Sequence, residues 1–328
     1  MSDGAIAGHR HVPLTEKVLR MVRRDAAAFF VYLITTVIVV AAAILSPTFR
    51  ELSNITDVLR QSIVLGLVTI GQVYVMLARG IDMSVGMIAR VVGLGTAVVL
   101  TMGILPPVVV LALGLAAGAL IGLVNGVLVA RFGAQPFIAT LGMMGVLYGV
   151  AYAISDGPTG LIPFGVMSMY DTRLGIVPVA VIVMAGIWIL AWLALRATRF
   201  GRAIYAVGGS PAVARLAGLN SDRVVLLTYV LSGLMSAAAG IFLLARSGVG
   251  NPNMALGLEF RSIVAAAIGG VSLYGGRGSL AGALGAVLLV SVISNVFDLF
   301  QFSAYYQDLA LGLIVVVAVA VHKQDSGK

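Results

Sequence analysis

Apolar segments of bilayer-spanning length occupy most of this 328-residue chain and limit what it can fold into. They fall at roughly 26–45, 61–78, 83–102, 107–130, 136–154, 175–195, 224–245, 262–274, 279–297 and 304–322. A helix needs about 20 apolar residues to cross the hydrocarbon core of a membrane. Because 60% of the residues are hydrophobic and only 10% are charged, the sequence predicts an all-α, polytopic membrane helix bundle with about ten transmembrane segments.

Segment 262–274 differs from the others because it is short and bounded by glycine. The sequence leaves open whether the regions 79–90 and 262–279 form broken or re-entrant helices. Segment 26–45 follows basic residues as a signal peptide would, but its length and the 25 residues before it favour a retained helix. We therefore expect one transmembrane domain over 26–322, a cytosolic N-terminal segment over 1–25 and a cytosolic tail over 323–328.

The lysines and arginines predict the orientation of the bundle. With both termini inside, the inside segments carry 15 of the 21 basic residues, the outside segments carry five, and Arg90 lies within a span. Basic residues concentrate in the cytosolic loops of membrane proteins. Both termini and the polar segment 196–223 are therefore expected on the cytosolic side.

The polar segment 196–223 contains the signals of a short helix. Ser210 is a suitable N-cap, Pro211 suits the first helical position, and Gly218 suits the C′ position. Val213 and Leu216 would share one face with Ala217, at helical spacing. Two turns offer little apolar area for adsorption to lipid, so the sequence favours docking of this helix, Pro211–Ala217, into a groove on a partner protein.

Several polar side chains within or beside the spans are candidates for a solute pathway, because ionisable groups at membrane depth are costly and often functional. These candidates are Asp82, Ser84, Arg90, Asn125, Gln135 and Thr140. Asp82 and Ser84 could equally cap the third span, with Asp82 paired to Arg79, and Asp82 is also a candidate counter-ion for Arg90. The two amides and Thr140 could bond a neighbouring helix instead of a solute.

Small residues on the segment 107–130 predict a packing surface. Glycine recurs there at every fourth position, namely Gly114, Gly118, Gly122 and Gly126, and such a stripe lets another helix approach closely. A possible internal repeat is indicated by Arg60-Gln-Ser-Ile-Val and Arg261-Ser-Ile-Val, each of which begins a helix that leads to a glycine-marked break. Chance similarity between apolar helices is the alternative.

Motifs for enzymatic chemistry are missing from the sequence. It holds no cysteine, its three histidines lie near the termini, and no GxxxxGK[ST] phosphate-binding loop occurs. We expect no metal and no cofactor on this chain. We also expect a transport function whose energy is supplied by another protein.

Three ordered motifs resemble the permease subunit of bacterial ABC importers for ribose, xylose, galactosides and related monosaccharides. Gly80-Ile-Asp-Met-Ser-Val-Gly86 resembles the family's GGIDLSVG, with Arg79 where glycine is usual. Phe200-Gly-Arg-Ala-Ile-Tyr-Ala-Val-Gly-Gly209, with Ala214-Arg-Leu-Ala-Gly-Leu-Asn220, resembles its cytosolic loop. Ala267-Ile-Gly-Gly-Val-Ser-Leu-Tyr-Gly-Gly-Arg-Gly-Ser279 resembles its glycine-rich signature.

The resemblance implies an inner-membrane importer subunit for a monosaccharide-like solute, such as a ribose-type sugar, a polyol or autoinducer-2. It implies a second permease, identical or paralogous, two ABC ATPases that bind ATP and Mg²⁺, and an extracytoplasmic solute-binding protein, with no nucleic acid. The loop would couple the permease to the ATPases through Phe200, Gly201, Arg202, Ser210, Pro211, Val213, Arg215, Leu216, Gly218 and Asn220. Arg79 and Arg90 depart from what is expected of a route for neutral sugars, which leaves open that the solute is phosphorylated, acidic or otherwise unusual. The alternatives are a secondary transporter driven by ion gradients and a non-transporting scaffold.

Overall fold

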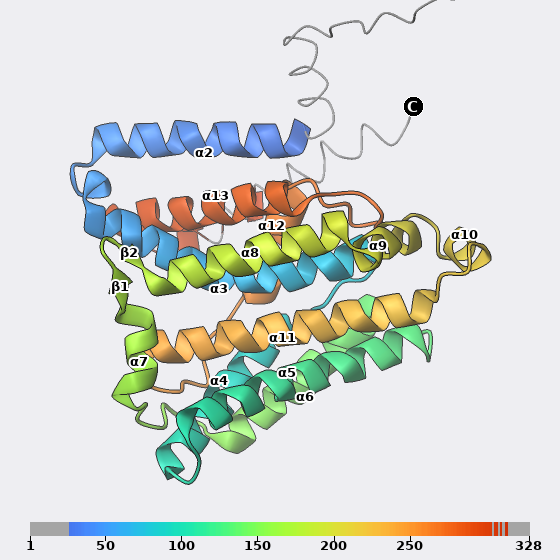
Figure 1. Ribbon diagram of the computed structural model, residues 1–328. Helices are drawn as coiled ribbons and strands as arrows, with labels where there is room; N and C mark the ends of the chain where they lie inside the picture. The colour runs from blue at the N-terminus through green and yellow to red at the C-terminus, as the bar shows by residue number, and fades with distance from the viewer. Residues whose placement is uncertain (1–25, 304, 308, 310–311, 314–328) are drawn as a thin grey trace, which may run out of the picture.

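The computed structural model describes residues 26–303, 305–307, 309 and 312–313, and helices make up nearly all of it (Figure 1). The expected cytosolic segment 1–25, the tail 323–328 and most of the segment 304–322 lie outside the described residues. Within the described part, strand structure is confined to a two-residue antiparallel pair, β1 (Arg173–Leu174) and β2 (Val177–Pro178). The prediction of an all-α membrane protein is confirmed.

Eight helices in the described residues are long and apolar enough to cross a membrane. They are α2 (Ala26–Leu45), α3 (Leu52–Leu77), α4 (Val85–Met102), α5 (Pro107–Ala130), α6 (Pro136–Ile154), α8 (Val179–Ala197), α11 (Ser221–Ser247) and α13 (Leu280–Leu299). The predicted segment 262–274 corresponds to α12 (Leu258–Ile268), which has only 11 residues. At about 1.5 Å per residue, α12 is too short to cross the bilayer.

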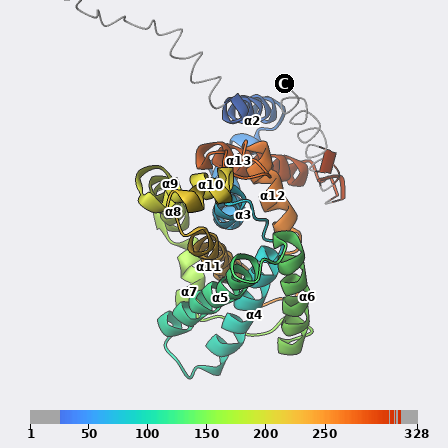
Figure 2. The ribbon, with the colours of Figure 1, turned by 90° about the vertical axis from the view of Figure 1, so that its right-hand side faces the viewer.

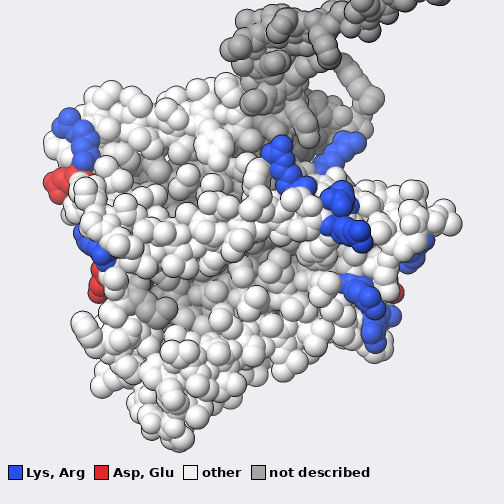
Figure 3. Space-filling view, in the orientation of Figure 1, with Lys and Arg blue, Asp and Glu red and all other residues white. Residues whose placement is uncertain are grey.

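The short elements gather at the two ends of the bundle (Figure 1). The one-turn helix η1 (Thr48–Arg50), α7 (Phe164–Asp171) and the β1–β2 pair lie at one end, and α9 (Arg199–Gly209) and α10 (Pro211–Leu216) lie at the other. On the face that Figure 3 shows, charged side chains lie at both ends with an uncharged band between them, and arginines are concentrated near α9 and α10. This distribution suits a chain whose middle lies in lipid.

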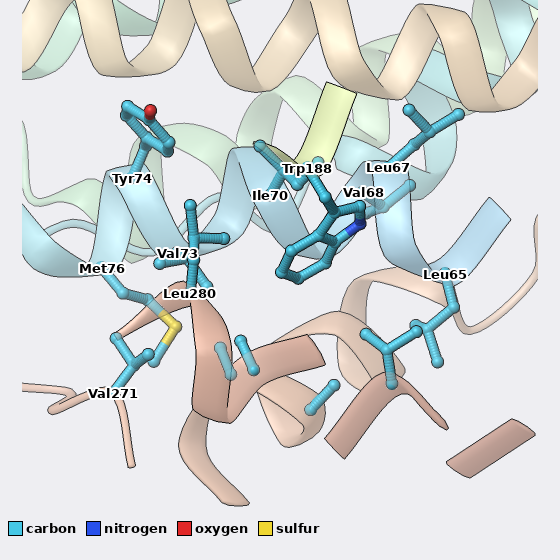
Figure 4. Packing of buried hydrophobic residues seen from close by; sticks show 14 of the residues in the cluster. Leu65, Leu67, Val68, Ile70, Val73, Tyr74, Met76, Trp188, Val271 and Leu280 are labelled. Atoms are coloured by element: carbon cyan, nitrogen blue, oxygen red, sulfur yellow. The ribbon is translucent and has the colours of Figure 1, made fainter. Parts of the chain in front are cut away.

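α3 occupies the centre of the bundle, surrounded by other helices in Figure 2. Between Ser62 and Leu77 every residue of α3 is buried, as expected for a helix that is apolar on all sides. Figure 4 shows part of this core, in which Ile70 and Val73 of α3 lie near Trp188 of α8 and Leu280 of α13.

The start of α3 differs from the sequence prediction. The helix begins at Leu52 and not near residue 61, so Arg60 lies inside the helix and not in an outside loop. Its side chain is buried, with the guanidinium 4.8 Å from the ring centroid of Tyr170 in α7 and 3.9 Å from the carboxylate of Asp57. The aromatic ring and the carboxylate allow α3 to continue past a charged residue, which hydrophobicity alone does not predict.

Three of the four glycines in the α5 stripe face α11. A methyl group at Gly122 would lie 2.2 Å from the carbonyl oxygen of Tyr229, and one at Gly118 would lie 2.4 Å from Cβ of Ala237. Gly114 faces Thr96 of α4, and Gly126 faces the backbone of Leu226. Only glycine therefore permits this approach of two helix backbones.

Candidate translocation site and coupling segment

The chain breaks its helical path between α3 and α4, where residues 78–84 turn back into the bundle. Arg79 adopts a left-handed conformation with φ 69°, and the carbonyl of Leu77 accepts a hydrogen bond from the amide of Gly276 at 2.9 Å. Gly80 packs so closely that a methyl group there would lie 2.6 Å from Oη of Tyr229. The break places polar backbone inside the bundle, where it needs hydrogen-bond partners.

Asp82 supplies the central acceptor of this break and is fully buried. Its Oδ1 accepts from the backbone amide of Ser84 at 3.0 Å and from the Ser84 hydroxyl at 2.6 Å. Its Oδ2 accepts from the hydroxyl of Ser232 in α11 at 2.8 Å. The carboxylate of Asp82 is therefore bound by hydroxyl and amide donors and not by either arginine considered from the sequence. Arg79 is exposed, and Arg90 donates its hydrogen bond to the carbonyl of Met254.

Two further candidates from the sequence join the same network. The Asn125 side-chain amide in α5 donates to the hydroxyl of Ser84 at 2.8 Å. Thr140 in α6 accepts from the amide of Met83 at 3.0 Å, and its hydroxyl lies 3.1 Å from the carbonyl of Ile81. Asp82, Ser84, Asn125 and Thr140 have no exposed surface, so in this conformation they bind the 78–84 segment to α5, α6 and α11.

Gln135 and Arg90 lie outside that network. Gln135 is exposed directly before α6. Arg90, in the second turn of α4, is buried, and its Nε donates to the carbonyl of Met254 at 3.1 Å. The guanidinium carbon lies 6.0 Å from the ring centroid of Tyr148. Sequence reasoning missed Tyr148 and the loop around Met254, because contacts 58 and 164 positions away leave no local signal.

The short helix expected in the polar segment is present as α10 (Pro211–Leu216). The hydroxyl of Ser210 accepts from the amide of Val213 at 3.4 Å, Pro211 occupies the first turn, and Gly218 has φ 80°. Asn220 caps the next helix by accepting from the amide of Arg223 at 2.9 Å. The caps predicted from the sequence therefore form as expected.

One face of α10 is exposed apolar surface. Val213 is 63% exposed and Leu216 is 89% exposed, whereas Ala214 faces the bundle and is buried. Arg215 is exposed on the same helix. α10 therefore presents two aliphatic side chains and one guanidinium beyond the end of the bundle.

α9 (Arg199–Gly209), which the sequence did not predict, connects α10 to the membrane helices. The hydroxyl of Thr198 accepts from the amide of Gly201 at 3.1 Å and starts the helix. Phe200 stacks on Tyr74 of α3, with ring centroids 6.4 Å apart, and Arg202 donates to the carbonyl of Ala197 at 3.3 Å. Phe200 and Gly201 are therefore packing residues of α9, with little surface left for a partner.

The end of α9 contacts two other backbone segments directly. A methyl group at Gly208 would lie 1.8 Å from the carbonyl oxygen of Leu77 and 2.6 Å from the amide nitrogen of Gly276. The hydroxyl of Tyr205 donates to the carbonyl of Gly278 at 2.9 Å. α9 is thus packed backbone to backbone against the end of α3 and the glycine-rich segment 269–279, immediately before the break that contains Asp82.

The bundle of membrane-length helices, with its buried polar break between α3 and α4, defines a polytopic membrane protein. The family model for the branched-chain amino acid transport system permease component matches residues 54–319, and the chain belongs to this family. Together with the eight apolar helices, this makes the chain a multi-pass protein of the inner membrane.

Curated relatives cover most of the chain. It is 37% identical over 284 residues to the ribose import permease protein of Escherichia coli (strain K12), covering 84% of this chain and 88% of the relative. It is 36% identical to the ribose import permease protein of Bacillus subtilis (strain 168), covering 87% and 89%. It is 35% identical to the fructose import permease protein of Rhizobium meliloti, covering 94% and 88%. No solved structure matches the chain.

Proposed function

We propose that the chain is the membrane subunit of an ATP-binding-cassette importer and translocates a monosaccharide or a sugar-like solute into the cytoplasm. The relatives named for ribose and fructose import support a monosaccharide. Energy would come from separate ATPase subunits, and the solute from an extracytoplasmic binding protein. A second permease, identical or paralogous, would complete the pathway.

The exposed apolar face of α10 is the main observation that supports this proposal. Val213 and Leu216 project from the end of the bundle where basic side chains gather (Figure 3), which the distribution of positive charge assigns to the cytosol. Two aliphatic side chains on a six-residue helix offer too little area to hold it on lipid. An amphipathic helix with such anchors suits a hydrophobic groove on a partner protein, and the ATPase is that partner.

The packing of α9 explains how a partner at α10 would act on the membrane helices. α9 is separated from α10 by Ser210 alone, and Gly208 fixes α9 against Leu77 and Gly276. A displacement of α10 is therefore transmitted to the end of α3 and to the segment that follows it. The bonds of Asp82 and Ser232 then connect that segment to α11.

The alternative of a secondary transporter gains no support from the relatives, which are import permeases. Ion-coupled carriers use intramembrane carboxylates as ion sites. In this structure both oxygens of Asp82 are already occupied by hydrogen-bond donors of the chain itself.

The docking role of α10 is tested by co-purification of the ATPase with the permease. The variant Leu216→Glu changes a side chain that is 89% exposed, so the bundle should insert and fold normally. Burying a carboxylate in an apolar groove without a partner is strongly unfavourable, so we expect loss of most of the associated ATPase. Leu161→Glu is the matched control, because Leu161 is 83% exposed in the loop after α6, at the opposite end of the bundle. Equal ATPase recovery with both variants would overturn the assignment of α10.

A further inference from the structure

A second polar cluster lies around Arg90, apart from the Asp82 network. Its members come from α4, from α6, from the loop 248–257 and from the first turn of α12. They are Arg90, Tyr148, Tyr152, Asn253 and Glu259. The inference drawn from this cluster rests on the proposed import function.

Arg90 brings hydrogen-bond donors to this cluster that no group of the described chain accepts. The side chain is 1% exposed, and Nε alone has a partner, the carbonyl of Met254. Nη1 and Nη2 are buried and have no acceptor. Buried guanidinium groups are normally paired and fully hydrogen-bonded. Two donor nitrogens of Arg90 are therefore available to a bound ligand.

The other side of the cluster is aromatic and half open. Tyr148 and Tyr152 are one helical turn apart on α6, with ring centroids 5.0 Å apart, and they are 52% and 38% exposed. The Tyr152 hydroxyl lies 3.4 Å from Oδ1 of Asn253, which is exposed. Two rings and an amide thus line the approach to Arg90.

Glu259 adds an acceptor and a compensating charge. Its carboxylate lies against α4, because a methyl group at Gly86 would be 2.2 Å from Oε2. Gly86 is one turn before Arg90, so the Glu259 carboxyl group lies on the side of α4 that carries Arg90. The cluster therefore contains one basic and one acidic side chain.

Arg90, the central charge of this cluster, is buried in a helix long and apolar enough to cross a membrane. Tyr148 is the thirteenth residue of the 19-residue α6, and Glu259 lies in the first turn of α12. Charged and polar side chains at membrane depth face either the protein interior or a water-filled cavity. Exposed residues in the middle of other spans are apolar, for example Ile189 of α8 and Leu120 of α5. An aqueous pathway along the α4–α6–α12 face would accommodate the polar groups of the Arg90 cluster.

We propose that the Arg90 cluster is a binding site for a neutral polyhydroxylated solute within the translocation pathway. The free Nη1 and Nη2 groups donate to solute hydroxyl oxygens, and the Glu259 carboxylate accepts from solute hydroxyl groups. The rings of Tyr148 and Tyr152 pack against the C–H face of the sugar. Because Glu259 offsets the charge of Arg90, the site favours a neutral sugar over a sugar phosphate or a sugar acid.

The absence of cysteine from the sequence allows a direct test with single-cysteine variants. Asn253→Cys and Tyr152→Cys are placed in the complete transporter in proteoliposomes and exposed to a charged, membrane-impermeant thiol reagent during ATP turnover. Ile189→Cys is the matched control, since Ile189 is 58% exposed near the middle of α8. D-ribose, D-allose, D-fructose and D-galactose serve as neutral probes, and ribose 5-phosphate as the anionic probe.

If the Arg90 cluster lines the aqueous pathway, the cysteines of Asn253→Cys and Tyr152→Cys should react at least about tenfold faster than that of Ile189→Cys. The reason is that a charged reagent does not reach thiols that face lipid. At least one neutral sugar should slow the reaction, and ribose 5-phosphate should not. Reaction as slow as that of Ile189→Cys would show that this face is not aqueous. Protection by ribose 5-phosphate alone, or by no probe, would overturn the assignment of a neutral-sugar site.

A second pair of variants separates a role in solute binding from a role in folding. Arg90→Gln replaces the guanidinium with a shorter, uncharged amide, and Arg60→Gln makes the same change in another buried arginine that lies over a tyrosine ring. We expect sugar uptake per ATP hydrolysed to fall about tenfold for Arg90→Gln only. Equal losses in both variants would contradict the proposal. Failure of the unmodified transporter to take up any sugar with ATP would instead contradict the proposed function, whatever the labelling shows.

Discussion

Asp82 shows how a charged residue at membrane depth can serve the fold of the chain. Both of its carboxylate oxygens accept hydrogen bonds from Ser84 or Ser232, three bonds in total, and the side chain has no contact with solvent. Removing one partner from such a buried group leaves the others unsatisfied, which costs about 1–3 kcal/mol for each group. In this conformation Asp82 therefore fixes the break between α3 and α4 in place.

Substitution of Asp82 should accordingly affect stability before transport. Asp82→Leu leaves the hydroxyls of Ser84 and Ser232 without their acceptor, so we expect a lower unfolding temperature of the detergent-solubilised permease. Asp82→Asn keeps the shape and one acceptor oxygen and should lose less. Thermal unfolding of both variants and the parent checks this order. Unchanged stability of Asp82→Leu combined with lost uptake would instead identify Asp82 as a solute contact.

At the scale of elements, α9 is the mechanical connection between α10 and the membrane helices. Its C-terminal turn leaves no space between Gly208, Leu77 and Gly276, whereas α10 beyond it is largely exposed. Close-packed interiors transmit displacement because they cannot be compressed. We propose that the end of α9 is a joint through which movement of α10 reaches α3.

Two adjacent glycines test this joint. A methyl group at Gly208 would lie 1.8 Å from the carbonyl oxygen of Leu77, whereas one at Gly209 meets nothing within 4 Å. Gly208→Ala must push α9 away from α3, so we expect normal ATPase association with reduced sugar uptake per ATP hydrolysed. Gly209→Ala should behave as the parent in both assays. Identical uptake ratios for the two variants would show that the joint does not transmit movement.

At the scale of the whole molecule, local signals explain what could be predicted from the sequence. The spans follow from apolar length, and α10 follows from the caps at Ser210 and Gly218, which act within a few residues. α9 escaped prediction because three of its 11 residues are glycine, which disfavours helix, and its stability comes from packing on Tyr74 and Leu77.

The residues of the candidate site likewise divide into those that local sequence signals indicate and those that depend on which helices pack together. Polar residues in apolar spans drew attention to Asp82, Ser84, Asn125 and Thr140, and the fold does bring these four together. Their partner Ser232 and the placement of Glu259 beside Arg90 depend on which helices pack together. A single sequence does not contain that information.

Solute uptake by the complete assembly tests the central claim that this permease is driven by ATP hydrolysis through α10. The permease, its ATPase and its binding protein are reconstituted in proteoliposomes, and accumulation of radiolabelled D-ribose, D-allose, D-fructose and D-galactose is measured with and without ATP. The account predicts accumulation of at least one sugar that requires ATP and the binding protein and is abolished by Leu216→Glu. Accumulation driven by an ion gradient in the absence of ATP would contradict it.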